Sequence, residues 1–413
     1  MADHDILIRN AQLRSNQQGD LVALAIADGR IKAIGRDVKG TAAVEIDARG
    51  NLVTESFADS HMHLCKVYTR KMMDDEAMKV YLDGGAMGTA MTGIELAARV
   101  KEKYKEDWII KNVRKVLALG AIYGTTHIRG LADVDTKGRL EGVKALLKAR
   151  EEFKGIINLQ VTPFAQDGVV REPGTEELMR QAMDMGCDAV GGIPWIEYTD
   201  ADIAEHVRII FDIAVKYDKP VSMLVDDAGD PGLRSLEVMA LETIKRGWYG
   251  RSLAHHARAM SLYPTPYLMK LAFLLNKARM GVVTDPHTGP LHLRVKELLA
   301  QGCLVCIGQD DISDAYYSYG RENMMEVAFL ASHLLWMTSR PEMETIFDMV
   351  TTKSFKAIGI DHALKEGAAA HLVVHDQPNV WEVLRFHEAP AYVISHGRVI
   401  DREKMWKIAR AQE

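Results

Sequence analysis

Residues 156–193 contain, in order, the runs IINLQVTPFA, EELMRQAMDMG and CDAVGGI. The outer two runs are apolar and of strand length, and the middle run has apolar residues at helical spacing. The same order continues with ADIAEHVRIIFDIAVKYD at 201–218 and PVSMLV at 220–225, and it recurs as far as CLVCIGQDD at 303–311. Repeated strand–helix units predict a parallel sheet with crossover helices. About seven or eight such units favour a closed (β/α)8 TIM-type barrel over an open doubly wound sheet.

Both ends of the chain differ from this middle part, because they consist of short β-like runs between turns. Residues 1–55 include ILIRNAQL and DLVALAIADGRIKAIG, and Asp28-Gly29 in the second run is typical of a hairpin. Residues 361–413 return to the same pattern with AAAHLVVHD and PAYVISHGRVIDRE. We therefore expect residues 1–55 plus 361–413 to form one small β domain and residues 56–360 to form the α/β barrel.

The composition excludes several classes of protein. The 413 residues include 51 Lys and Arg against 57 Asp and Glu, which gives a net charge of −6, and 47% are hydrophobic. These values are ordinary for a globular chain and argue against a disordered or a nucleic-acid-binding one. The sequence has no apolar run of about 18 residues, and MADHDILIRN lacks the features of a secretory signal. We therefore expect a cytoplasmic protein that does not bind membranes.

The cysteines agree with that compartment, where thiols stay reduced. The chain has four, which are Cys65, Cys187, Cys303 and Cys306. Cys303 and Cys306 have the spacing of a redox or zinc pair, but they lie in CLVCIG, which we interpret as a buried strand. Side chains three residues apart on a strand point to opposite faces, so we expect both thiols to be structural.

The clearest candidate for chemistry is a pair of histidines, His61 and His63, in DSHMHL after the apolar run LVTESFA. Residues two apart on a strand lie on one face, so both imidazoles can reach one metal ion. Asp310 and Asp311 follow the buried run CLVCIG near the end of the repeat series. Adjacent carboxylates are costly to hold together unless a cation or a proton transfer uses them. The active sites of such barrels lie at the carboxyl ends of the strands, where both pairs are expected.

Polar residues also stand at the ends of three other predicted strands. His255 and His256 close the run SLAHHA, and because adjacent residues point opposite ways, at most one of them faces the barrel mouth. Asp226 and Asp227 follow PVSMLV. Gln166 follows IINLQVTPFA, and its neutral amide suits an amide-like ring edge.

The stretch Lys71–Gly93 interrupts the alternation. It contains five methionines and two adjacent glycines in KMMDDEAMKVYLDGGAMGTAMTG. It is either a helix and loop packed on the barrel rim or a mobile flap over the active site, with methionine as an adaptable apolar lining.

Taken together, these motifs resemble the amidohydrolase superfamily, and within it the cytosine deaminase branch, which includes triazine-ring enzymes such as isopropylammelide amidohydrolase. The resemblance covers nearly the whole chain, and HMH, FAQDG, DMGCDAVGG, IGQDD and EGAAAHLVVHD carry it. It implies a metal-dependent (β/α)8 barrel and a composite β-sandwich built from both termini.

The resemblance also implies roles for individual residues. His61, His63 and Asp310 match metal ligands, and Asp310 also moves protons in the family. His256 matches a histidine that assists the attacking water. Asp227 stands where the family usually has a proton-shuttling glutamate. The implied catalytic groups are therefore Asp310, Asp227 and His256. The implied substrate-binding residues are Gln166, Asp311, Tyr316 and Trp195.

The chain departs from its relatives at three positions where they carry histidine, which here are Leu131, Trp195 and Leu224. Leu224 replaces a metal ligand, so we expect weaker metal binding unless Asp226, Asp227 or His256 supplies a substitute. A more apolar mouth should also favour a substrate with a hydrophobic or aromatic part. Imidazole and carboxylate ligands suit several divalent metals, and we expect Zn or Fe.

The sequence thus predicts an enzyme that hydrolyses a C–N bond in a nitrogen heterocycle, by deamination or as a cyclic amidase, with a metal-activated water. Two alternatives stay open. One is a metal-free relative that catalyses a different hydrolysis or an isomerisation on a similar ring, and the other is a non-catalytic ligand-binding homologue. We expect a small heterocyclic molecule as the partner and no nucleic acid or membrane. Relatives are often homo-oligomers, but the sequence does not fix the oligomeric state.

Overall fold

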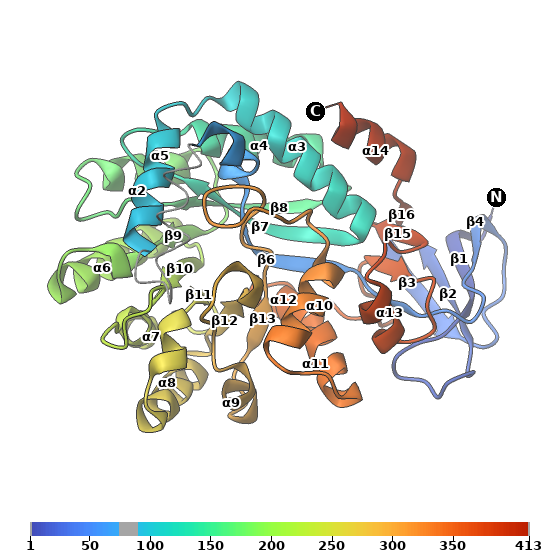
Figure 1. The fold of residues 1–413 in the computed structure, drawn as a ribbon. Coiled ribbons are helices and arrows are strands. Elements are labelled where there is room, and N and C mark those ends of the chain that lie inside the picture. Colours follow the sequence, from blue (N-terminus) through green and yellow to red (C-terminus); the bar gives the residue numbers. More distant parts are fainter. Residues whose placement is uncertain (1, 74–89, 412–413) are drawn as a thin grey trace.

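The computed structural model describes residues 2–73 and 90–411, and its centre is the predicted barrel (Figure 1). Eight parallel strands follow one another around the sheet in chain order. They are β6 (Phe57–His63), β7 (Thr125–Asp133), β8 (Asn158–Phe164), β9 (Val190–Gly192), β10 (Val221–Val225), β11 (Ser252–His256), β12 (Gly281–Thr284) and β13 (Val305–Ile307). The prediction of a (β/α)8 barrel is therefore confirmed.

Helices connect these strands and cover the outside of the barrel (Figure 1). Helix α6 (Asp200–Tyr217) matches the predicted run, and the Thr199 side chain caps it by accepting a hydrogen bond from the Asp202 amide. The other helices of this part are α2 (Ala90–Lys101), α3 (Glu106–Tyr123), α4 (Glu141–Glu152), α5 (Thr175–Asp184), α7 (Ser235–Lys245), α8 (Thr265–Ala278), α9 (Val295–Ala300), α10 (Met324–Leu334), α11 (Arg340–Val350) and α12 (Thr352–Ala357).

The barrel closes between its first and last strands, next to the predicted metal ligands. Met62 in β6 forms a parallel bridge with Asp310, which follows β13. The Asp310 amide donates to the His61 carbonyl and the His63 amide donates to the Asp310 carbonyl, both at 2.8 Å. The backbone that closes the barrel thus also fixes the relative positions of His61, His63 and Asp310.

Residues from the two termini form two four-stranded sheets beside the barrel (Figure 1). The first contains β1 (His4–Ala11), β2 (Val22–Ala27), β3 (Arg30–Gly35) and β4 (Ala42–Asp47). The second contains β5 (Val53–Glu55), β14 (Leu372–Val374), β15 (Tyr392–Ser395) and β16 (Arg398–Val399). Ile8, Ile26, Leu372 and Ile394 lie in one shared apolar core, so N- and C-terminal residues pack together. The exact boundaries 1–55, 56–360 and 361–413 remain a prediction.

Two local details of these sheets bear on the sequence analysis. The predicted hairpin turn joins β2 and β3, where Asp28 and Gly29 both have positive φ, 52° and 72°. The run LVTESFA does not form one strand, because its first part pairs with β14 as β5 and its end begins β6. His61 and His63 therefore lie inside β6, at its carboxyl end. The pairing register of β6 with β7 shifts between Asp59 and Met62.

Other predictions have different outcomes. Most of Lys71–Gly93 lies outside the described residues, so the choice between rim helix and flap remains open. All four cysteines are free and buried. Cys303 contacts the Ala272 carbonyl and Cys306 contacts the Val282 carbonyl, in agreement with separate structural roles. Within residues 2–73 and 90–411, no helix combines the length and apolarity needed to cross a membrane. The cytoplasmic location remains a prediction.

Two buried histidines near β14 make the stability of the fold depend on pH. Burial lowers the pKa of both His371 and His375 to about 3, whereas an unfolded histidine titrates near 6.5. Above about pH 6.5 both states are neutral at these positions. As the pH falls from about 6.5 toward about 3, only the unfolded chain gains the protons, so stability is lost.

We expect each of these histidines to cost about 2 kcal/mol of unfolding free energy between about pH 7 and pH 5. Denaturant unfolding of the protein and of His375→Gln at both pH values measures this loss. The variant should lose about 2 kcal/mol less than the parent protein. Replacement of the exposed His333 by Gln should leave the pH dependence as in the parent. A His375→Gln variant with the same loss as the parent would contradict this origin of the pH dependence.

Candidate active site

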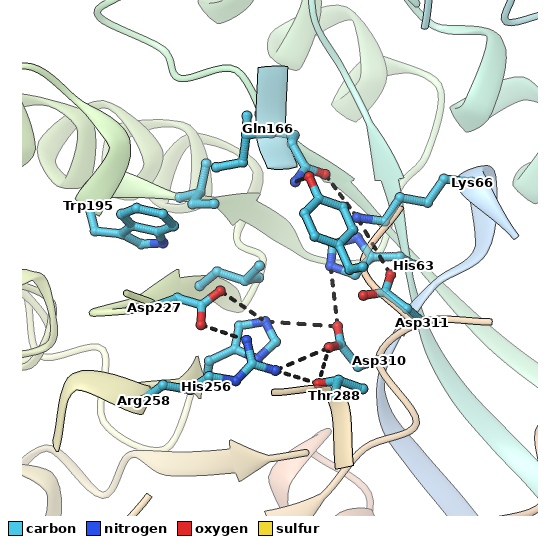
Figure 2. Close-up of a pocket in the computed structure, with 14 residues that line it drawn as sticks. His63, Lys66, Gln166, Trp195, Asp227, His256, Arg258, Thr288, Asp310 and Asp311 are labelled. Atoms are coloured by element: carbon cyan, nitrogen blue, oxygen red, sulfur yellow. Dashed lines mark hydrogen bonds and ion pairs between the residues drawn. The ribbon is translucent and has the colours of Figure 1, made fainter. Parts of the chain in front are cut away.

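A cavity with about 440 Å³ of empty space opens at the carboxyl ends of the barrel strands (Figure 2). One wall is apolar, the opposite wall is polar, and the floor carries imidazoles, carboxylates and one guanidinium. The lining residues are His63, Lys66, Ile94, Gln166, Ile193, Trp195, Leu224, Asp227, His256, Arg258, Thr288, Asp310, Asp311 and Tyr316. The cavity thus contains every predicted site residue except His61, which lies directly beneath it.

Three imidazoles and one carboxylate meet in the floor of the cavity. His61, His63, His256 and Asp310 each offer one ligand atom, and these atoms all lie within 4.8 Å of one another. The Nε2 atoms of His61, His63 and His256 lie 2.9, 3.7 and 3.9 Å from Asp310 Oδ1. Burial lowers the pKa of all three histidines, which favours the neutral rings that act as metal ligands. This donor set fits a divalent transition metal.

Neighbouring residues orient two of the three imidazoles. His256 Nδ1 lies 2.8 Å from an oxygen of the Asp285 carboxylate, which leaves Nε2 directed at the cluster. His61 Nδ1 lies 2.8 Å from Nδ1 of His255, and His255 Nε2 in turn contacts Ser222 Oγ. Such outer partners are typical of metal-binding histidines, because they fix the tautomer and the ring orientation.

His255 and His256 have different roles, and the structure shows which of the two faces the cavity. His256 has a positive φ of 65°, so the strand alternation ends there and its ring turns into the cavity. His255 lies below the cavity and supports His61. Sequence reasoning correctly placed only one of the pair at the mouth, but it did not find the support that the other gives.

The adjacent carboxyls Asp310 and Asp311 have different environments. Burial disfavours the Asp310 carboxylate, but the His256 and His61 imidazoles hold its pKa well below the usual value. Burial, together with the negative charge of Asp310, raises the pKa of Asp311 well above its usual value. The pKa values of these two adjacent carboxyls are therefore shifted in opposite directions.

An arginine that the sequence analysis did not select binds three carboxylates at the floor. Arg258 Nη1 donates to Asp227 Oδ1 at 2.7 Å, and Nη2 lies 3.0 Å from Asp285 Oδ2 and 3.4 Å from Asp310 Oδ2. Its side chain is only 6% exposed. Nη2 also donates to Thr288 Oγ1, and that hydroxyl donates to Asp310 Oδ2 at 2.8 Å. Asp310 therefore presents one oxygen to the imidazoles and the other to Arg258 and Thr288 (Figure 2).

We expect Arg258→Met to lower the free energy of unfolding by about 3–5 kcal/mol, because it leaves buried carboxylates without their cation. Arg258→Lys keeps the charge but loses the planar fork, so it should cost less. Chemical denaturation measures both. Arg36 provides the control, since its ion pair with Asp20 is exposed and Arg36→Met should cost less than about 1 kcal/mol. Equal effects of Arg258→Met and Arg36→Met would contradict this assignment.

Of the adjacent residues Asp226 and Asp227, only Asp227 faces the cavity, just as only His256 does in the histidine pair. Asp226 points away from the cavity and accepts hydrogen bonds from Ser235 Oγ and Tyr263 Oη at 2.6 and 2.8 Å. Asp227 lines the cavity, and its Oδ2 lies 3.9 Å from His256 Nε2. Burial raises the pKa of Asp227, and the Arg258 guanidinium opposes that effect. Of the three substitute ligands considered, His256 is the one that the structure places among His61, His63 and Asp310.

The polar wall is a chain of hydrogen bonds around Gln166. Lys66 Nζ donates to Gln166 Oε1 at 3.2 Å, and Gln166 Nε2 lies 3.2 Å from Tyr316 Oη. Lys66 Nζ also lies 3.6 Å from Asp311 Oδ1 and 4.3 Å from the Tyr316 ring centroid. Lys66 was not predicted from the sequence, because a single lysine three residues after HMH has no distinctive spacing.

The opposite wall is apolar and contains Trp195 and Leu224, with Leu131 packed in the same cluster behind the lining. Leu131, Trp195 and Leu224 belong to one apolar cluster. The other buried members are Ile94, Phe164, Ile193 and Ile196. One side of the cavity is therefore apolar, as expected from the sequence, and the three residues lie in one cluster.

Comparisons with known proteins agree with this geometry. Residues 110–401 match the profile of the amidohydrolase family. The chain belongs to the amidohydrolase family. As a member it is an enzyme of the hydrolase class, and the resemblance inferred from its motifs is confirmed. This amidohydrolase is 28% identical to N-isopropylammelide isopropyl amidohydrolase of Pseudomonas sp. (strain ADP) over 98% of both chains.

Two solved structures are similar to the amidohydrolase over almost its entire length. The 5-methylcytosine deaminase of Klebsiella pneumoniae, liganded with 5-fluorocytosine, has a TM-score of 0.86 at 30% identity and covers 95% of this chain and 97% of its own. The N-isopropylammelide isopropylaminohydrolase of Burkholderia multivorans has a TM-score of 0.79 at 23% identity, covering 96% and 98%. The second likeness, at lower identity, supports the fold.

Proposed function

We propose that this amidohydrolase hydrolyses the bond between a ring carbon and nitrogen in a nitrogen heterocycle that carries an apolar substituent. The observation that carries the proposal is the cluster of His61, His63, His256 and Asp310 at the floor of a cavity with one polar and one apolar wall. The names of the relatives support the reaction class, since they describe a deaminase of 5-methylcytosine and an amidohydrolase of isopropylammelide.

His61, His63, His256 and Asp310 would hold one divalent metal ion, and we propose Zn or Fe. The chemistry that such an ion supplies is a bound water whose pKa falls from 15.7 toward about 7. A third imidazole from His256 would replace the ligand that is missing at Leu224. The site therefore keeps four protein donors in spite of that replacement.

Asp310 would handle the proton of the attacking water. Its Oδ1 lies 2.9 Å from His61 Nε2 and faces the imidazole cluster, where a carboxylate can take up and return a proton. In the reaction a bond forms between the ring carbon and the water oxygen, and the bond from that carbon to nitrogen breaks. The proton accepted by Asp310 is then delivered to the departing nitrogen, so the carboxylate is regenerated. Asp227, on the other side of His256, would act as the second proton carrier.

The two walls would orient the ring. Gln166 and Lys66 would hydrogen-bond to the polar edge of the heterocycle, with Asp311 and Tyr316 beside them. Trp195 and Leu224 would contact the apolar substituent. This orientation would set the reacting carbon above Asp310 and His256, and it would disfavour a small polar ring such as unsubstituted cytosine.

Two measurements test the proposal. The metal content of protein purified without added metal is determined first, and the expected result is one Zn or Fe per chain. Amino-pyrimidines, amino-triazines and cyclic ureides, with and without alkyl or aryl substituents, are then screened for released ammonia or amine and for ring opening by mass spectrometry. Turnover that is higher for the substituted rings supports the proposal. Turnover without bound metal would point to the metal-free alternative, and binding without turnover would point to the ligand-binding alternative.

A further inference from the structure

Trp195 is the one buried tryptophan in the described part of the chain, and its indole N–H has no hydrogen-bond partner there, whereas the less buried Trp108 and Trp248 have one. Trp108 Nε1 donates to the Lys103 carbonyl at 2.9 Å, and Trp248 Nε1 donates to the Lys219 carbonyl at 3.2 Å. Trp195 is 7% exposed, so water reaches it poorly from outside. Buried donors are almost always paired in native proteins, and an unpaired one calls for an explanation.

The position of Trp195 supplies that explanation, because the residue lines the active-site cavity. It lies in a short 3-10 helix, Pro194–Ile196, directly after β9. Figure 2 shows its ring across the cavity from Lys66, with the nitrogen on the ring edge nearer the cavity. The N–H itself has almost no accessible surface, so a molecule in the cavity would accept a hydrogen bond from it after a small shift of the indole toward the cavity.

The surroundings of Trp195 restrict what such an acceptor is attached to. Leu131, Ile193 and Leu224 belong to the same apolar cluster as Trp195, and Asp227 is a charged residue on the same side of the cavity (Figure 2). A charged or strongly hydrated group placed there would lose its water without compensation. An oxygen within an otherwise apolar substituent, as in an ether or a carbonyl, satisfies the N–H and still buries its carbon atoms against these side chains.

We propose that Trp195 determines specificity by donating a hydrogen bond from Nε1 to an ether or carbonyl oxygen in the substituent of the substrate. This inference rests on the proposed function for the location of the ring, and it adds the chemical class of the substituent. Trp195 is a binding residue in this role and takes no part in proton transfer. A site built around such a donor discriminates strongly against a ligand that lacks the acceptor, because the donor then stays buried and unpaired.

The test compares two ligands that differ by one atom. An amino-pyrimidine or amino-triazine carrying a 2-methoxyethyl group is compared with the same ring carrying a butyl group, in which a methylene replaces the oxygen. Calorimetry gives the affinity of each ligand for the holoenzyme, and steady-state kinetics gives kcat and KM. The expected result is an affinity about tenfold or more higher for the methoxyethyl ligand, with the difference in KM rather than kcat.

Trp195→Phe removes the N–H, so the preference for the methoxyethyl ligand over the butyl ligand should disappear, whatever affinity both ligands lose in common through the smaller ring. Trp248→Phe, remote from the cavity, is the control and should keep the preference. A Trp195→Phe variant that retains the preference would overturn the inference. So would equal binding of the two ligands to the parent protein, a comparison that needs no variant to fold. If the parent binds both ligands but turns over neither, the proposed function fails while the affinities still decide the role of Trp195.

Discussion

Asp310→Asn should lower kcat/KM by at least about 1,000-fold, the largest effect that we expect from a single substitution. Asparagine is close in shape to aspartate, but it cannot accept and return a proton, and a proton carrier alone contributes about 100- to 10,000-fold. Asp310 also offers Oδ1 to the metal cluster and Oδ2 to Arg258 and Thr288, so the substitution removes charge from both contacts.

Steady-state kinetics on a substrate from the screen measures this loss, and metal content measured on the same preparation separates loss of the ion from loss of the base. Asp311→Asn is an informative comparison, because Asp311 lines the cavity without belonging to the metal cluster, so its amide replacement should cost far less. Asp361→Asn, at an exposed position, should leave kcat/KM unchanged. Activity retained in Asp310→Asn at the parent metal content would remove Asp310 from the mechanism.

Removal of the metal should abolish activity, and His256→Asn should reduce the affinity for the metal by more than about 100-fold. The reason is that in the proposed site His256 is the third imidazole ligand, and loss of an outer partner alone typically costs 10- to 100-fold. Dialysis against a chelator followed by addition of Zn or Fe tests the first statement. Competition titration against a chromophoric chelator measures the second.

Substitutions of two other histidines serve as comparisons for the metal affinity of His256→Asn. His255 contacts His61 without a place in the cluster, so His255→Asn should fall within the 10- to 100-fold range. His333 is exposed and remote, and its replacement should have no effect on metal affinity. Equal metal affinity in His256→Asn and in the parent would show that only three residues hold the ion.

The strand-end patterns were sufficient to predict the barrel and to select His61, His63 and Asp310. The regular alternation of strands and helices along the chain is enough to predict the fold. The barrel then brings the carboxyl ends of all its strands to one rim, whatever their distance in sequence. The predicted roles of these residues in catalysis and metal binding await the experiments above.

Arg258, Asp285 and Thr288 could not be found in this way. Arg258 stands in an unremarkable ARAMS segment, and its importance arises only because three separate strand ends direct carboxylates at it. The turn of His256 into the cavity depends on a positive φ, which nothing in SLAHHA indicates. Both features depend on how distant parts of the chain come together in the fold and not on a local sequence pattern.

The closure of the barrel at Met62 and Asp310 has a consequence for how the protein opens. His61 and His63 belong to the first strand and Asp310 follows the last, so an ion held by all three would clamp the two edges of the sheet together. Thermal fluctuations that separate these edges would have to break ligand bonds as well as two peptide hydrogen bonds. Amide exchange at His63 and Asp310 would therefore slow when the ion binds, and the ion would also stabilise the closed barrel.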